Sequence, residues 1–169
     1  LNTAGRLMKE GGAHMVKIEG GAPQLETVRH LTARAVPVCG HLGLMPQSIH
    51  QLGAYRVQGR EEHEGERILK DAIGLQKAGV QMLVLECVPA LLAEEITRAL
   101  EIPVIGIGAG VDTDGQVLVL YDMLGITLHG TPSFVRDFLA EEGTVAAALS
   151  AYVHAVRAET FPAEEHTFT

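Results

Sequence analysis

Two charged side chains interrupt an apolar segment near the start of the chain. Lys17 and Glu19 lie two residues apart in the run VKIEGG, which otherwise favours a short buried strand. Side chains alternate between the two faces of a strand, so both charges share one face. They could form an ion pair with each other or with other interior charges. Alternatively, the lysine could bind an anionic substrate while the carboxylate holds a hard cation such as Mg²⁺.

A further carboxylate, Glu86, follows the apolar run MLVL. Apolar surroundings disfavour the charged form of a carboxylic acid, which suits a general base that takes up a proton near neutral pH. The structural alternative is an acid stabilised by the dipole of a helix that begins around Pro89. Cys87, beside it, is interpreted as a small buried hydrophobe, because no histidine follows it in a local motif.

Two other motifs leave alternatives open. His41 follows Gly40 at the end of an apolar run, where a single histidine is more often structural than catalytic. The run GIGAG, residues 106–110, is typical either of a loop that cradles phosphate or of close packing at a strand end. It lacks the GxGxxG spacing, so a dinucleotide-dependent oxidoreductase is the weakest functional alternative.

The elements that must position these residues follow from the alternation of apolar and amphipathic runs. Strands are predicted at residues 15–19, 36–44, 81–89, 102–110 and 115–125. Helices are predicted at residues 22–35, 61–78, 90–100, 132–142 and 144–158, and the segment 1–12 is interpreted as the last turns of another helix. The strands are solidly apolar, as parallel strands covered on both faces are, which indicates the α/β class.

In parallel α/β folds the ligand site lies at the carboxyl ends of the strands. The chemically unusual residues fall there: Lys17, Glu19, His41, Glu86, the GIGAG run and Asp122. Polar residues from five successive strands favour convergence on one barrel mouth over a single crevice. The predicted site therefore lies at one end of a barrel-like sheet.

Composition narrows the class of protein. The chain has 169 residues and a net charge of −8, so we expect one domain over 1–169, with neither nucleic acid nor an anionic membrane as a partner. The two cysteines lie outside any CxxC pair, which favours a reducing compartment, the cytoplasm. No apolar run reaches membrane-spanning length. Because the chain starts without Met and as if within a helix, we expect it to be the C-terminal part of a longer protein.

Several long stretches, in order along nearly all of the chain, resemble the ketopantoate hydroxymethyltransferase family. They are MVKIEGG, VPVCGHLGLMPQSIHQLGAYRVQGR, LVLECVP, IPVIGIGAG with DGQVLVLYDMLGI, and FPAEEHTF. The resemblance implies a (β/α)8 TIM-type barrel, of which this chain supplies about strands four to eight and the C-terminal helices. Ala54 stands where the family usually has a second glycine, and GVDTDGQ is one variant of a variable loop.

The resemblance also implies an activity. It is the transfer of a hydroxymethyl group from 5,10-methylenetetrahydrofolate to 3-methyl-2-oxobutanoate, giving 2-dehydropantoate in pantothenate biosynthesis. Glu86 is then the proton acceptor, Lys17 binds the oxoacid, and Glu19 is the one Mg²⁺ ligand present, with two aspartates expected outside this chain. His41 lies near the site, and the family forms large homo-oligomers, decamers among them.

Two functions of other kinds stay open at this point. One is a magnesium-dependent 2-oxoacid lyase or mutase of the isocitrate lyase type, which would share the enolate chemistry but not the folate. The other is an inactive fragment that acts only as a subunit or scaffold. Turnover that depends on folate distinguishes the first from the transferase, and the intact mass of the expressed chain bears on the second.

Overall fold

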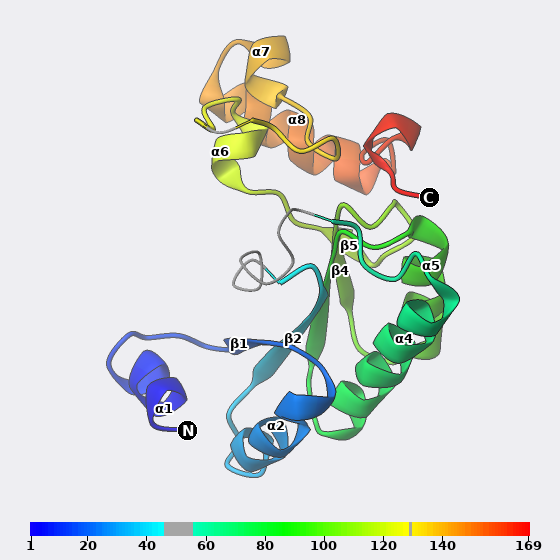
Figure 1. Cartoon of the computed structure of the whole chain (residues 1–169). Coiled ribbons are helices and arrows are strands. Elements are labelled where there is room, and N and C mark those ends of the chain that lie inside the picture. Colours follow the sequence, from blue (N-terminus) through cyan, green and yellow to red (C-terminus); the bar gives the residue numbers. More distant parts are fainter. Residues whose placement is uncertain (46–55, 129) are drawn as a thin grey trace.

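The computed structural model describes residues 1–45, 56–128 and 130–169 and is built around one parallel sheet (Figure 1). The strands are β1 (Val16–Glu19), β2 (Val38–Gly43), β3 (Met82–Glu86), β4 (Val104–Ile107) and β5 (Gly115–Gln116). They pair in the order β1-β2-β3-β4-β5, each parallel to its neighbour. The α/β class with five parallel strands is thereby confirmed.

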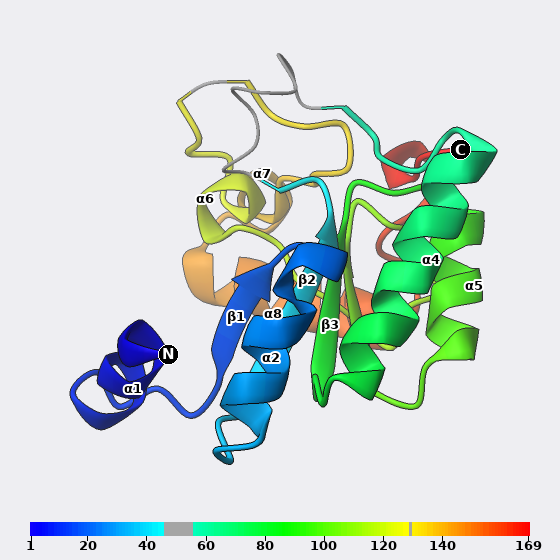
Figure 2. The same ribbon diagram turned by 60° about the horizontal axis from the view of Figure 1, so that its bottom comes forward.

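Helices connect these strands and extend the chain at both ends. They are α1 (Asn2–Lys9), η1 (Ala22–Gln24), α2 (Leu25–Thr32), α4 (Glu62–Lys77), α5 (Ala90–Ala99), α6 (Leu120–Met123), α7 (Phe138–Glu142), α8 (Val145–Arg157) and η3 (Glu164–His166). Figure 2 shows α2, α4 and α5 along one side of the sheet, with α8 behind it. Strands in sequential order need crossovers of one hand, which places their connecting helices on one face.

The face covered by α2, α4 and α5 holds the main apolar core. Alternate strand residues point into it and are almost fully buried: Val38, Leu42, Leu83, Leu85 and Val104. They belong to one cluster with helix residues Val28, Leu31, Ala72, Leu75 and Ile96. We call this side of the sheet the helix-covered face.

A second apolar cluster lies on the other side of the sheet, toward the C-terminal helices. It includes Leu44, Cys87 and Ile107 from the strand ends and Phe134, Phe138, Ala148 and Phe161 from the last third of the chain. The ring of Phe138 meets those of Tyr152 and Phe161 edge to face, at centroid distances of 5.6 and 5.5 Å. Aromatic packing of this kind holds the C-terminal segment together, and the apolar cluster joins this segment to the strand ends.

Most of the predicted elements are confirmed, but two are wrong. The strand predicted at 115–125 shrinks to Gly115–Gln116, and Leu120–Met123 forms α6 instead. As an edge strand β5 has one neighbour, and that neighbour, β4, ends at Ile107, where glycines with positive φ turn the chain. The helix predicted at 132–142 is reduced to α7, whose N-cap is the Asp137 side chain.

The described helices are also short by membrane standards. Within the described ranges, none combines the length and apolar character that crossing a bilayer requires. Residues 46–55, which include Ala54 and part of the stretch VPVCGHLGLMPQSIHQLGAYRVQGR, lie outside the described residues. The assignment of residues 1–169 to a single domain stays a prediction.

Candidate active site

The face of the sheet opposite α2, α4 and α5 carries polar side chains at the carboxyl ends of adjacent strands. The register pairs Glu19 of β1 with His41 of β2, and Gly43 of β2 with Glu86 of β3. Lys17 lies two residues before Glu19 and therefore shares its face. Lys17, Glu19, His41, Gly43 and Glu86 define what we call the site face.

Four predicted site residues come together on this face through a chain of close contacts. Lys17 Nζ donates a hydrogen bond to Glu19 Oε1 at 3.1 Å and lies 3.1 Å from His41 Nδ1. His41 Nε2 lies 3.2 Å from Glu86 Oε2. The histidine therefore stands between the lysine and the second carboxylate, which come from strands that are not neighbours.

The contacts of His41 restrict how its ring carries protons. A lysine ammonium group has only donors, so we infer that Nδ1 of His41 accepts and that the neutral ring carries its proton on Nε2. That proton faces the Glu86 carboxylate. Nε2 nonetheless has no hydrogen-bond partner among the described residues, so its 3.2 Å approach to Glu86 is a close contact without hydrogen-bond geometry.

Exposure changes steeply across this chain of contacts. The His41 side chain is 1% exposed and that of Glu86 15%, whereas 47% of the Lys17 side chain is exposed. The lysine therefore lies where a solute from solvent can reach it. The buried His41 side chain lies between Lys17 and Glu86.

Glu19 is the predicted Mg²⁺ ligand, and the surroundings of its carboxylate fit one position in a metal's ligand set. Its Oε1 is occupied by Lys17, whereas its Oε2 is buried without a hydrogen-bond partner among the described residues. An unsatisfied buried polar atom costs about 1–3 kcal/mol, which a bound cation would offset. The described residues contain no group of three or more His, Cys, Asp or Glu able to hold a metal, so further ligands would have to come from elsewhere.

The structure bears on the structural alternatives for Lys17 and Glu19 and for Glu86. An ion pair between Lys17 and Glu19 is present, as the structural interpretation expected. For Glu86, the described side chains include none that caps α5, and this carboxylate contacts His41 instead. The helix predicted around Pro89 is present as α5, so the helix-dipole explanation of Glu86 stays an alternative.

The cysteines behave as buried hydrophobes. Burial, and secondarily the adjacent Glu86 charge, raise the pKa of Cys87 to about 12. Burial also raises the pKa of Cys39. Both thiols are buried, so neither supplies a thiolate nucleophile near neutral pH, and the interpretation of Cys87 is confirmed.

The glycines of the GIGAG run make close packing contacts. A Cβ atom at Gly106 would lie 2.8 Å from Thr113 Oγ1, one at Gly108 would lie 2.8 Å from the Phe134 ring, and one at Gly110 would lie 2.6 Å from the Ala90 Cβ. All of these separations are shorter than side-chain carbons tolerate. The packing interpretation of this run is therefore favoured over the phosphate loop.

Asp122 does not belong to the chain of contacts on the site face, contrary to its predicted place at a strand end. It lies in α6, where it is buried and accepts a hydrogen bond from Thr127 Oγ1. The predicted place is wrong because the apolar run around Val117 and Val119 is typical of a longer strand.

A residue that the sequence analysis missed is Gly43. It has a positive φ of 91° and lies directly against the backbone of Glu86. The signal that could have found it is the second glycine of the run GHLGL, two residues after His41 and hence on the same face.

A cavity of about 570 Å³ borders the site at the carboxyl ends of β1 and β2. Glu19 and Gly43 line it on the sheet side, and Gln58, Arg67 and Asp71 on the other. Larger cavities lie elsewhere, such as the one of about 770 Å³ beside α1, but they contain none of the site-face residues. Of the site-face residues, this cavity touches Glu19 and Gly43, and part of its other wall belongs to α4.

Comparisons with known proteins identify the family to which the chain is similar. The sequence model of the family described as ketopantoate hydroxymethyltransferase matches residues 1–164. The chain is 58% identical over 168 residues to the 3-methyl-2-oxobutanoate hydroxymethyltransferase of Halorhodospira halophila, and 59% identical over 165 residues to that of Edwardsiella ictaluri. These matches cover 99% and 98% of the chain but 61% and 62% of the relatives, so the chain spans about three fifths of their length.

Proposed function

The chain belongs to the ketopantoate hydroxymethyltransferase family, and from this membership we propose that it supplies the catalytic face of a hydroxymethyl transfer to 3-methyl-2-oxobutanoate. The one-carbon donor is 5,10-methylenetetrahydrofolate and the product is 2-dehydropantoate. The observation that carries the proposal is the contact chain from Lys17 through His41 to Glu86. It puts a cation and a carboxylate on one face, as deprotonation of an anionic substrate requires.

Lys17 is the substrate-binding group in this proposal. Its side chain is about half exposed, and its ammonium group carries the opposite charge to a 2-oxoacid. When the C3 proton leaves, negative charge moves to the ketone oxygen. A positioned cation stabilises that charge more strongly in the transition state than in the ground state.

Glu86 is the proton acceptor. It takes the C3 proton while the electrons of the C–H bond move into the carbonyl system. The resulting enolate carbon then forms the new C–C bond with the methylene carbon of the folate, and a water molecule supplies the hydroxyl oxygen. Both C–N bonds of that methylene carbon break, and tetrahydrofolate leaves. Its two nitrogens take up the proton held by Glu86 and the proton released by the water. His41 keeps the base close to the oxoacid side of the site through its contacts on both sides.

Glu19 would hold Mg²⁺ through the carboxylate oxygen that lacks a partner. When bound, the ion would polarise the ketone and so acidify the neighbouring C–H bond. Magnesium is usually held by one or two carboxylates with substrate and water oxygens, so aspartates elsewhere in the protein would complete the set.

The closed barrel is a further part of the proposal. Its support is the sequential, all-parallel strand order and the presence of an outer edge on both β1 and β5. Exposed parallel-sheet edges are rare in finished folds, because they present unpaired backbone groups. We propose that additional strands join these edges to complete a (β/α)8 barrel, in a cytoplasmic homo-oligomer whose thiols stay reduced.

The test is turnover with a complete set of substrates. The purified protein is mixed with 3-methyl-2-oxobutanoate, 5,10-methylenetetrahydrofolate and Mg²⁺, and 2-dehydropantoate is followed by mass spectrometry. Product that requires the folate supports the proposal. Consumption of the oxoacid without folate would point to the lyase or mutase alternative, and no consumption at all would point to a non-catalytic subunit.

A further inference from the structure

The carboxyl end of β2 approaches the backbone of Glu86 so closely that only glycine fits there. Gly43 has φ 91°, and a Cβ atom on it would lie 2.1 Å from the Glu86 carbonyl oxygen and 2.9 Å from Val88 Cγ1. The next residue, Leu44, donates its backbone N–H to the same Glu86 oxygen at 2.8 Å. The end of β2, at Gly43 and Leu44, therefore contacts the peptide group of Glu86, the proposed base.

The chain after Glu86 is held from β4 as well. Cys87 donates its N–H to the Ile107 oxygen at 2.9 Å, and Val88 donates to the Gly108 oxygen at 3.2 Å. Cys87 also has a positive φ of 51°, a conformation that a residue with a side chain adopts only when its surroundings impose it. The backbone that carries Glu86 is therefore fixed from both neighbouring strands.

We propose that Gly43 is a positioning residue for Glu86, which sets where the base stands on the site face relative to His41 and the substrate. A contact with a carbonyl oxygen cannot be relieved by turning a side chain, so a methyl group at position 43 has to displace one of the two strands. Separating the two atoms to an ordinary contact distance requires a shift on the order of 1 Å, and misplacements of that size cost about 10²-fold in rate. The inference rests on the proposed function, because it takes Glu86 as the base.

The experiment compares Gly43→Ala with Gly143→Ala. Gly143 also has a positive φ, 74°, but a Cβ atom there would meet nothing within 4 Å. Both variants add a methyl group to a left-handed residue, and only the first brings it against Glu86. We expect Gly43→Ala to slow solvent exchange of the C3 proton of 3-methyl-2-oxobutanoate about 100-fold, with KM changed less than about threefold. Gly143→Ala should exchange at the wild-type rate.

Two further measurements separate positioning from general damage. In a Glu86→Gln background, Gly43→Ala should reduce the residual exchange by less than about twofold, because the group it positions is already lost. If Gly43→Ala does not fold, an amide-to-ester replacement at Leu44 removes the N–H donor to Glu86 without adding an atom. It should slow exchange by roughly tenfold, about the value of one hydrogen bond.

Failure of the inference about Gly43 can be distinguished from failure of the proposed function. If the wild-type protein catalyses no exchange, the assignment of Glu86 as base is wrong. Crystal structures of the two glycine variants then decide the positioning claim without any activity: Glu86 Oε2 should move away from His41 Nε2 in Gly43→Ala only. A Glu86 carboxylate in its original place, or exchange at the Gly143→Ala rate, overturns the inference.

Discussion

The two faces of the sheet are built from alternate residues of the same strands, yet they meet different demands. On the helix-covered face, Leu83, Leu85 and Val104 have no exposed surface and belong to the main apolar cluster. On the site face, His41 is buried to the same degree but lies among Lys17, Glu19 and Glu86. The difference shows that burial alone does not distinguish a core position from a candidate site position, because the charge of the neighbouring side chains differs between the two.

Substitution of neighbouring residues on opposite faces of the sheet tests this comparison. Substitutions on the site face should change chemistry with little effect on stability. Substitutions on the helix-covered face should do the reverse.

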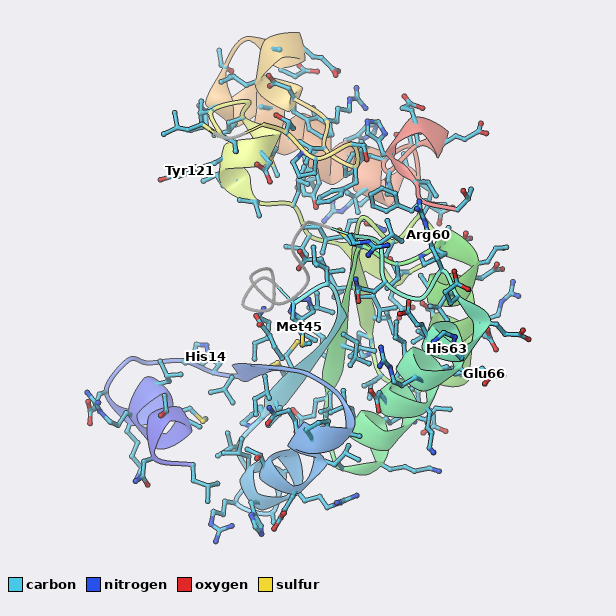
Figure 3. All side chains as sticks on the ribbon, in the orientation of Figure 1. His14, Met45, Arg60, His63, Glu66 and Tyr121 are labelled. Carbon is cyan, nitrogen blue, oxygen red and sulfur yellow. The ribbon has the colours of Figure 1, made fainter. Side chains whose placement is uncertain are left out.

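The largest effect is expected from Glu86→Gln. The amide cannot accept the C3 proton, so exchange of that proton with D2O, followed by NMR, should fall by about 10³-fold. The free energy of unfolding should stay near its wild-type value. Glu66→Gln is the matched control, because this exposed carboxylate projects from α4 away from the sheet (Figure 3). Exchange at the wild-type rate in Glu86→Gln would remove Glu86 as the base.

Leu85→Ala, one residue earlier, should give the opposite result. Leu85 is fully buried on the helix-covered face, so its truncation should lower the free energy of unfolding by about 2–5 kcal/mol. Urea denaturation measures this loss. The exchange rate per folded molecule should stay within about twofold of wild type, since no site-face contact is removed. A comparable loss of rate would mean that the two faces are not independent.

Glu19→Ala should weaken Mg²⁺ binding by roughly tenfold or more, which corresponds to about 1.4 kcal/mol. The variant removes the carboxylate oxygen that lacks a partner, and titration calorimetry measures the affinity. Ile18→Val is the control on the other face, and it should cost about 1 kcal/mol of stability without changing the affinity. Unchanged magnesium affinity in Glu19→Ala would exclude Glu19 from the ligand set.

The smallest effect is expected from Cys87→Ala. With a pKa of about 12, the thiol stays protonated between pH 6 and 9, so the pH dependence of exchange should be unchanged. The raised pKa also means that Cys87 lowers stability only as pH rises above the pKa of about 8.5 that an unfolded cysteine has. A pH profile altered by the substitution would show that Cys87 takes part in the chemistry.

The sequence predicts the site better than it predicts the edges of the fold. The alternation rule correctly places Lys17 and Glu19 on one face, and the apolar run before Glu86 marks the end of β3. Those features are local, so they can be read without knowing which strands are neighbours.

What the sequence could not provide depends on register and on neighbours. The contact of His41 with both Lys17 and Glu86 requires three strands to be aligned, which no local pattern records. The close approach of Gly43 has the same origin. The fifth strand was predicted too long because its pairing depends on where β4 ends.

The order of the strands also sets the distance between the strand of Lys17 and the strand of Glu86. β2 separates the strand of Lys17 from that of Glu86, and two strand spacings amount to about 10 Å. In the proposed mechanism, a substrate held by Lys17 must therefore lie across the ring of His41 before its C3 atom reaches Glu86. In that proposal, the separation of two strand spacings limits the substrates to molecules short enough to be held by Lys17 at one end and reached by Glu86 at the other.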